Sequence, residues 1–167
     1  PLHHISKLAD PFDYSTHVNQ LILAKQLIEH GADVNAVSNQ WGQTPLHDAC
    51  DSVVVTNLDL VKFLLEAGAD PNLHDHRGMI PLMYTFPDAP GAAKFLLNWP
   101  TTDVNIISRS GASFLALVRH TVKELSRLVA LPDDPNRVRH QFKLRQWREI
   151  EEMLVERGAV DTGITVF

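Results

Sequence analysis

The motif Thr44-Pro45-Leu46-His47, followed further along by Gly68-Ala69-Asp70-Pro71-Asn72, decides the fold of this 167-residue chain. Thr44 can cap a helix by accepting a backbone N–H, and Pro45 at the first helical position has no N–H to leave unbonded. We expect the leucine to point into the core and His47 to hydrogen-bond back to the Thr44 hydroxyl. The first motif therefore predicts the start of a helix.

Both motifs recur along the chain. The second motif has copies at Gly31–Asn35, Gly68–Asn72 and Thr102–Asn105, with a degenerate one at Gly158–Asp161. Each copy follows an apolar run that reads as a helix, and glycine after a helix favours a left-handed cap. Degenerate copies of the first motif lie at Ile80–Met83 and Ser113–Ala116. The leucine of the motif recurs after 36 and then 33 positions. Such a period predicts stacked units, because no unit can bury its apolar face alone.

The pattern resembles the ankyrin repeat family, and the resemblance covers nearly the whole chain. It implies an all-α solenoid of stacked antiparallel helix pairs with short hairpin loops. We divide the chain into one domain of four repeats, at about 1–36, 37–73, 74–106 and 107–167, with an insertion at about 119–147. The hairpin asparagines are turn formers whose side chains we expect to bond nearby backbone. They also match positions that an asparaginyl hydroxylase modifies in some family members, so the candidate hydroxylation sites are Asn35, Asn72 and Asn105.

Several segments depart from the pattern. Repeat one needs a long loop, Lys7 to Thr16, and Pro1-Leu2-His3 looks like the first motif without its first residue, so we expect the natural chain to extend upstream. Repeat two carries extra residues near Val53–Val55 and Asn39–Trp41. In repeat three, Pro87 and Pro90 predict a turn between the helices.

The fourth repeat is the most altered. We expect a loop at Pro132–Asn136, then one extended helix from about 137 to 157, because that stretch contains no Pro or Gly. Its apolar residues fit one helical face only approximately. They are Val138, Phe142, Trp147, Ile150 and Leu154. The final Gly158–Gly163 hairpin predicts a C-terminal capping repeat.

Composition narrows the function classes. The net charge is −5, but residues 119–148 hold eight Lys/Arg and three Asp/Glu, or +5, which leaves −10 elsewhere. An acidic body disfavours general binding to nucleic acid. No apolar run approaches the roughly 18 residues of a membrane span, and no signal peptide is visible. Because Cys50 is the only cysteine, we expect no disulfide and a reducing intracellular compartment, the cytoplasm or nucleus. The capped C-terminal end favours a monomer.

The sequence does not favour catalysis. His74-Asp75-His76 is the best metal-like cluster, but its spacing implies no further ligand, and we expect no metal. Cys50 follows His47 by one helical turn, yet its position matches a small buried residue in the family, which predicts an inert thiol. We see no glycine-rich phosphate loop and no marked acid–base pair, so we expect a protein without enzymatic activity or cofactor.

A binding surface is the better prediction. In the family, partners dock on a concave face made by the hairpin tips and the first helix of each pair. Carried across, this face includes Val37, Asn39, Ile107 and Ala112 and the principal candidates Trp41, Gln43, Asp48, His74, His76, Arg77, Met79, Tyr84 and Arg109. Trp, Tyr and Arg dominate interface energies, which places Trp41, His76, Arg77 and Tyr84 at the centre of a site for a protein or peptide.

Two other functions stay open. The chain can be a targeting module of a larger protein whose catalytic or zinc-binding domain lies outside it. Alternatively, the basic insertion 119–148 can contact a polyanion. The residues for that contact are Arg137, Arg139, Lys143, Arg145 and Arg148.

Overall fold

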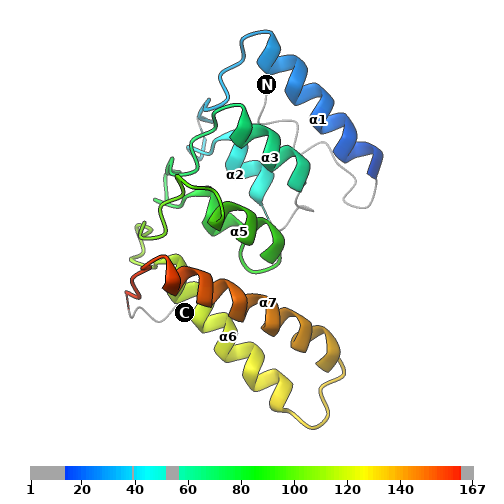
Figure 1. The fold of residues 1–167 in the computed structure, drawn as a ribbon, viewed down its shortest axis with the longest axis vertical. Helices are drawn as coiled ribbons and strands as arrows, with labels where there is room; N and C mark the ends of the chain where they lie inside the picture. Colours follow the sequence, from blue (N-terminus) through cyan, green and yellow to red (C-terminus); the bar gives the residue numbers. More distant parts are fainter. Residues whose placement is uncertain (1–13, 39, 52–56, 163–167) are drawn as a thin grey trace. The chain divides into compact units, whose positions relative to one another are not determined.

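The computed structural model describes residues 14–38, 40–51 and 57–162, with side chains from residue 18 onward. This part of the chain holds seven helices (Figure 1). They are α1 (Tyr14–Glu29), α2 (Pro45–Cys50), α3 (Leu58–Glu66), α4 (Pro81–Tyr84), α5 (Pro90–Leu97), α6 (Phe114–Ala130) and α7 (Arg137–Glu156). The described residues form no strand beyond an isolated bridge between Ile107 and Ser113. The all-α class predicted from the repeat pattern is confirmed.

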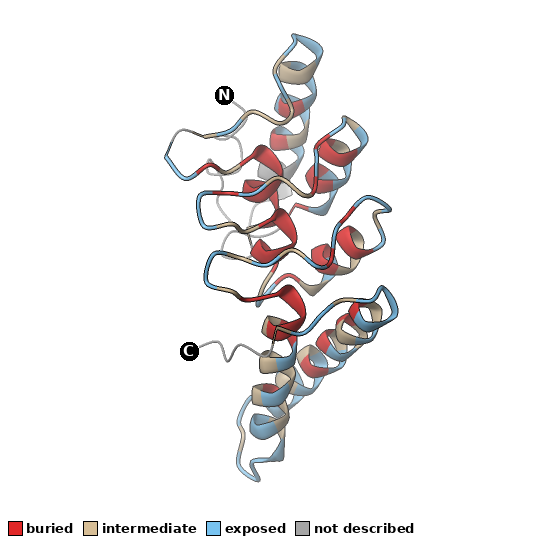
Figure 2. Ribbon diagram, turned by 90° about the vertical axis from the view of Figure 1, so that its left-hand side faces the viewer, coloured by how far each residue is buried: buried red, intermediate tan, exposed pale blue. Residues whose placement is uncertain are grey.

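The chain divides into two compact units, Pro1–Thr102 and Asp103–Phe167. In the first unit α2 packs against α3 and α4, while α3 also contacts α1 and α5. Every residue of α2 and of α4 is buried, as the red inner helices show (Figure 2). Burying a leucine side chain contributes roughly 1.5–3 kcal/mol, so such short helices are held by packing rather than by their own propensity.

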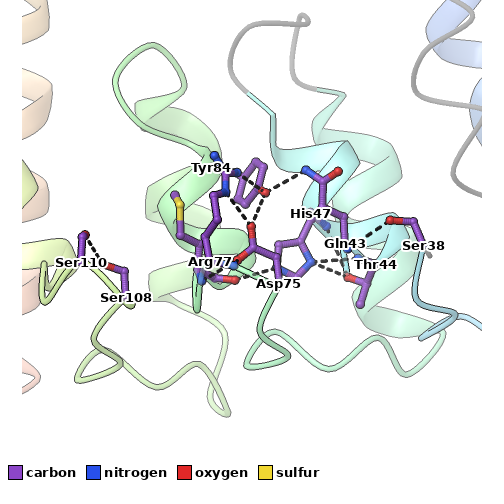
Figure 3. Close-up of polar contacts among 10 residues, drawn as sticks. Ser38, Gln43, Thr44, His47, Asp75, Arg77, Tyr84, Ser108 and Ser110 are labelled. Atoms are coloured by element: carbon purple, nitrogen blue, oxygen red, sulfur yellow. Dashed lines mark hydrogen bonds and ion pairs between the residues drawn. The ribbon is translucent and has the colours of Figure 1, made fainter. Parts of the chain in front are cut away.

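The start of α2 confirms the prediction from the first motif. The Thr44 side chain accepts from the backbone N–H of His47, and Pro45 occupies the first turn. His47 Nδ1 lies 3.0 Å from the Thr44 backbone nitrogen and 2.9 Å from its hydroxyl (Figure 3). Ser113 caps α6 in the same way by accepting from Ala116 N–H at 3.2 Å. Ile80 has no such oxygen, and α4 begins without a side-chain cap.

The same histidine connects two successive repeats. Because Nδ1 of His47 must accept the Thr44 N–H, its proton sits on Nε2, which donates to the Met79 carbonyl at 3.0 Å. The neutral ring therefore uses both nitrogens, one within its own repeat and one toward the next.

The hairpin asparagines also join repeats, which corrects our expectation that they bond nearby backbone. The Asn35 amide donates to the Gly68 carbonyl at 3.2 Å and accepts from the Asp70 N–H at 2.9 Å. The local turn is closed instead by Asp33, which accepts from the Asn35 N–H at 2.9 Å. Later hairpins repeat the scheme: Asn72 donates to Thr101 O, and Asn105 donates to Gly158 O and accepts from Val160 N–H.

Glycines end three of the helices as predicted. Gly31, Gly68 and Gly158 have φ of +85°, +95° and +75°, a left-handed conformation that residues with a Cβ rarely adopt. The cap turns the chain sharply into each hairpin.

The second unit is one long helix pair, α6 and α7, joined by a short turn (Figure 1). The residues predicted as an insertion, about 119–147, lie in both helices and in the turn between them. The loop expected at Pro132–Asn136 and the extended helix after it are confirmed. Phe114 and Trp147 meet edge-on, with ring centroids 6.4 Å apart. The α7 residues that reach the core are Leu144, Trp147, Ile150 and Leu154.

Some expectations about these segments were wrong. Val138 and Phe142, grouped above with the apolar face of α7, are 82% and 64% exposed. The loop expected to reach Thr16 ends earlier, because α1 already begins at Tyr14. Pro90 is the first residue of α5 rather than part of the preceding turn, a position where its missing N–H costs nothing. The extra residues expected at Val53–Val55 and Asn39 lie outside the described residues.

Replacing Asn35 with alanine should destabilise the first unit by about 1 kcal/mol, because the change removes both hydrogen bonds to the next hairpin. Urea unfolding followed by circular dichroism measures the loss. The exposed Asn19 on α1 provides the control, since Asn19→Ala removes the same groups elsewhere. Equal unfolding midpoints for the two variants would contradict the bridging role.

Candidate partner-binding surface

Three hairpins carry the candidate residues, and each turns on a glycine. Gly42, Gly78 and Gly111 have φ of +72°, +73° and +82°. These glycines lie outside the two motifs quoted from the sequence, although they recur after 36 and then 33 positions, the spacing of the motif leucines. Backbone bonds close each turn, such as Ser38 N–H to Gln43 O at 2.8 Å. A common turn thus presents different side chains from each repeat.

The first two hairpins touch at Trp41 and His76. The His76 N–H donates to the Trp41 carbonyl at 2.9 Å. A Cβ on Gly42 would lie 2.6 Å from His76 Cδ2, so only glycine permits this approach. The Trp41 side chain remains 53% exposed. Main-chain contacts therefore hold the tryptophan in place while its ring faces solvent.

Beneath the second hairpin lies a buried carboxylate that the sequence analysis considered only as part of a metal cluster. Asp75 is 4% exposed. Its Oδ1 accepts the backbone N–H groups of Arg77 and Met79 at 2.8 Å each. Its Oδ2 accepts from Arg77 Nε at 3.1 Å and from the Tyr84 hydroxyl at 2.7 Å. Burial would raise the pKa of Asp75, but these bonds outweigh it and lower the pKa below its usual value.

The Tyr84 hydroxyl connects this carboxylate to the preceding repeat. While donating to Asp75, it accepts from Gln43 Nε2 at 2.8 Å and from Arg77 (Figure 3). The Arg77 guanidinium also lies 5.3 Å from the centre of the Tyr84 ring. Burial and the bond to Asp75 raise the pKa of Tyr84 to about 12, so the phenol stays protonated and donating at neutral pH. The arginine is fixed although its side chain is 59% exposed.

The structure sorts the predicted contact residues by accessibility. Trp41, His74, His76, Arg77 and Arg109 are exposed, and Gln43 and Met79 are half-buried. Asp48 and Tyr84 are buried, at 8% exposure each, so they lie beneath the surface rather than on it. Val37 and Ile107 are exposed at 56% and 50%, Ala112 is buried, and Asn39 lies outside the described residues. Ile107, Arg109 and Ala112 belong to the second unit and the others to the first.

We call the exposed and half-buried principal candidates of the first unit the hairpin surface. Its residues are Trp41, Gln43, His74, His76, Arg77 and Met79. Two hairpins supply the backbone of this surface, and the Asp75–Tyr84 network fixes its arginine. Such an arrangement suits recognition of a partner by a preformed face.

The same residues were also compared with what a metal site or a reactive cysteine requires. Among the described residues, no three His, Cys, Asp or Glu side chains are grouped closely enough to hold a metal ion. Both Asp75 oxygens already accept hydrogen bonds. Cys50 is fully buried, and burial raises the pKa of its thiol far above its usual value, which leaves it un-ionised. Within the described part, no helix is both long and apolar enough to cross a bilayer.

Residues 14–75 match the family model for ankyrin repeats. The matched part of the chain belongs to the ankyrin repeat family. Ankyrin repeats are in general protein–protein interaction modules and are not catalytic. The match spans α1 to the second hairpin, which includes Trp41 and His74.

Curated relatives share this part of the chain. The 2-5A-dependent ribonuclease of Mus musculus is 41% identical over 63 residues, or 38% of this chain and 8% of the relative. The neurogenic locus Notch protein of Drosophila melanogaster is 36% identical over 92 residues, or 54% of this chain and 3% of the relative. The E3 ubiquitin-protein ligase KEG of Arabidopsis thaliana is 28% identical over 155 residues, or 81% of this chain and 9% of the relative. The chain thus spans less than a tenth of each of these relatives.

Acidification should destabilise the first unit through His47. Burial lowers the pKa of this ring below 6.5, and Nδ1 must stay unprotonated to accept the Thr44 N–H. Below about pH 6.5 the unfolded chain therefore binds a proton that the folded chain does not. The free energy of unfolding then decreases as the pH is lowered, by up to about 1.4 kcal/mol per pH unit. Urea titrations across this range measure the slope. The His47→Gln variant should lose that part of the slope, whereas an unchanged slope would contradict the assignment.

Removing the Tyr84 hydroxyl should destabilise the same unit. The Tyr84→Phe variant keeps the ring but deprives Asp75 of a donor and Gln43 of an acceptor, at a cost of roughly 1–3 kcal/mol. Thermal unfolding measures the loss. A Tyr84→Phe variant as stable as the parent would show that the network contributes nothing.

Proposed function

We propose that this chain binds a protein or peptide partner through the hairpin surface, with Trp41, His76 and Arg77 at its centre and Tyr84 supporting them from beneath. The observation that carries the proposal is the 53% exposed Trp41 ring, held against the next hairpin by a backbone hydrogen bond. An exposed tryptophan on a fixed backbone can bury much area on binding while losing little conformational entropy.

Arg77 strengthens this proposal because its side chain is already ordered. The guanidinium bonds Asp75 and Tyr84, yet the side chain is 59% exposed and available to a partner. Binding therefore orders few new side chains at this point, which favours affinity. Gln43, His74 and Met79 surround the centre as weaker contacts. Arg109, in the second unit, remains a separate proposed contact residue.

A broader role as the recognition part of a larger protein is the second proposal. It is favoured by the relatives, because this chain spans less than a tenth of a ribonuclease, a Notch protein and a ubiquitin ligase. Any catalytic or zinc-binding domain would then lie outside these residues. Reading the complete open reading frame decides this question directly.

The hairpin asparagines Asn35, Asn72 and Asn105 remain candidate hydroxylation sites. Each makes hydrogen bonds to the following hairpin through its amide. A hydroxylase must therefore reach a side chain that the stack holds in place.

The binding proposal predicts that Trp41→Ala weakens capture of the natural partner by more than tenfold, as expected for a central tryptophan. Affinity capture from native lysate with quantitative mass spectrometry provides the measurement. Ile22→Ala is the control, since Ile22 is an apolar side chain on α1 with a similar exposure of 49%. Full capture by a folded Trp41→Ala variant, confirmed by an unchanged melting temperature, would refute the proposal.

A further inference from the structure

Two large apolar side chains lie exposed one helical turn apart on α7. Val138 is 82% exposed and Phe142 is 64% exposed. Residues four apart on a helix are neighbours, so these two form a continuous apolar patch. Neither belongs to the core of the unit, which α7 supplies from the opposite side with Leu144, Trp147, Ile150 and Leu154.

Basic side chains predominate on the half of α7 that carries this patch, and Asp133 and Asp134 lie just before the helix begins. From Arg137 to Arg148, α7 carries five Lys/Arg and no Asp/Glu, whereas Glu149 to Glu156 contains four Glu and no Lys/Arg. Arg145 lies one turn beyond Phe142, with its side chain 83% exposed and an ion pair to Glu149 of 3.7 Å. The patch is thus an apolar spot within a cationic half-helix.

This arrangement opposes the dipole of the helix that carries it. A helix N-terminus carries partial positive charge and is stabilised by acidic residues, and a C-terminus by basic ones. The first turn of α7 contains no acidic residue and its last turn no basic residue. Asn136, at the N-cap, makes no side-chain capping bond. The order of charges along α7 therefore runs against its dipole, although the Arg145–Glu149 ion pair within the helix offsets this in part.

We propose that the N-terminal half of α7 is a docking surface for an acidic peptide segment of another protein, one with apolar side chains among its Asp and Glu residues. Val138 and Phe142 supply the apolar contact, and Arg139 and Arg145 flank it. Complementary charge would speed the encounter and set the orientation, while the apolar pair holds the bound segment.

The pattern fits a peptide better than a membrane or a nucleic acid. Helical spacing places Glu149, Glu152 and Glu156 on the same outward stripe as Val138 and Phe142, so anionic headgroups along this helix would be repelled. An extended phosphate backbone would meet the same glutamates. Val138, the more exposed of the pair, has no flat ring on which a base could stack. A short acidic segment can contact the basic half alone.

Fluorescence anisotropy tests this surface with a panel of labelled synthetic peptides. The peptides are rich in Glu and carry a Leu–Phe pair three or four residues apart, and a matched set replaces the pair with Ser. The structure predicts binding of an apolar-paired peptide, weakened at least about tenfold by the Ser replacement and by Phe142→Ala. Val155→Ala is the control on the same helix, since Val155 is 51% exposed but off the outward stripe and within the acidic half.

The charge contribution has its own variants. Exchanging Arg139 and Arg145 for Gln should weaken peptide binding and reduce its salt dependence, whereas Arg127→Gln on α6 should change neither. A second set of assays measures binding to a single-stranded oligonucleotide and to phosphatidylserine vesicles. Sedimentation measures association of the chain with a second copy of itself.

Binding to no peptide of the panel would overturn the proposal. So would binding that Phe142→Ala leaves unchanged, or a preference for the oligonucleotide, the vesicles or self-association that Phe142→Ala abolishes. The Trp41→Ala variant should retain peptide binding in full, so failure at this surface and failure at the hairpin surface are distinguishable.

Discussion

The first unit depends on polar side chains that hold one repeat to the next. His47 bonds its own helix start through Nδ1 and the Met79 carbonyl of the following repeat through Nε2. Asn35 bonds both the carbonyl of Gly68 and the N–H of Asp70 in the next hairpin. Apolar burial supplies the larger free energy, but it is not directional. These bonds fix the register in which the apolar faces meet.

That register is what makes a binding surface from otherwise ordinary loops. Once two hairpins are aligned, the His76 N–H reaches the Trp41 carbonyl, and Gly42 leaves room for the histidine ring. Tyr84 then reaches both Gln43 of the preceding repeat and Asp75 of its own. The side chains that face solvent are therefore positioned by groups that do not.

Sequence alone predicted the parts governed by local backbone chemistry. The Thr44 cap, the Gly68 turn and the long helix after Pro132–Asn136 follow from propensities that hold in any protein. The sequence predicted less where a contact with a distant part of the chain decides the hydrogen-bond partner or the burial of a residue. Nothing local shows that Asn35 bonds 33 residues ahead. Similarly, Tyr84 and Asp48 occupy positions typical of an exposed face, and only packing shows that they are buried. The exposure of Phe142 was missed because an irregular apolar pattern does not reveal which residues leave the face.

Hydrogen exchange on the free chain and on its complex with the captured partner tests the binding account most directly. The hairpins around Trp41 and His76 should gain protection in the complex, because a partner on the hairpin surface opposes the local opening that exposes their amides. Protection confined to α1 and α3, with both hairpins exchanging as in the free chain, would contradict the account.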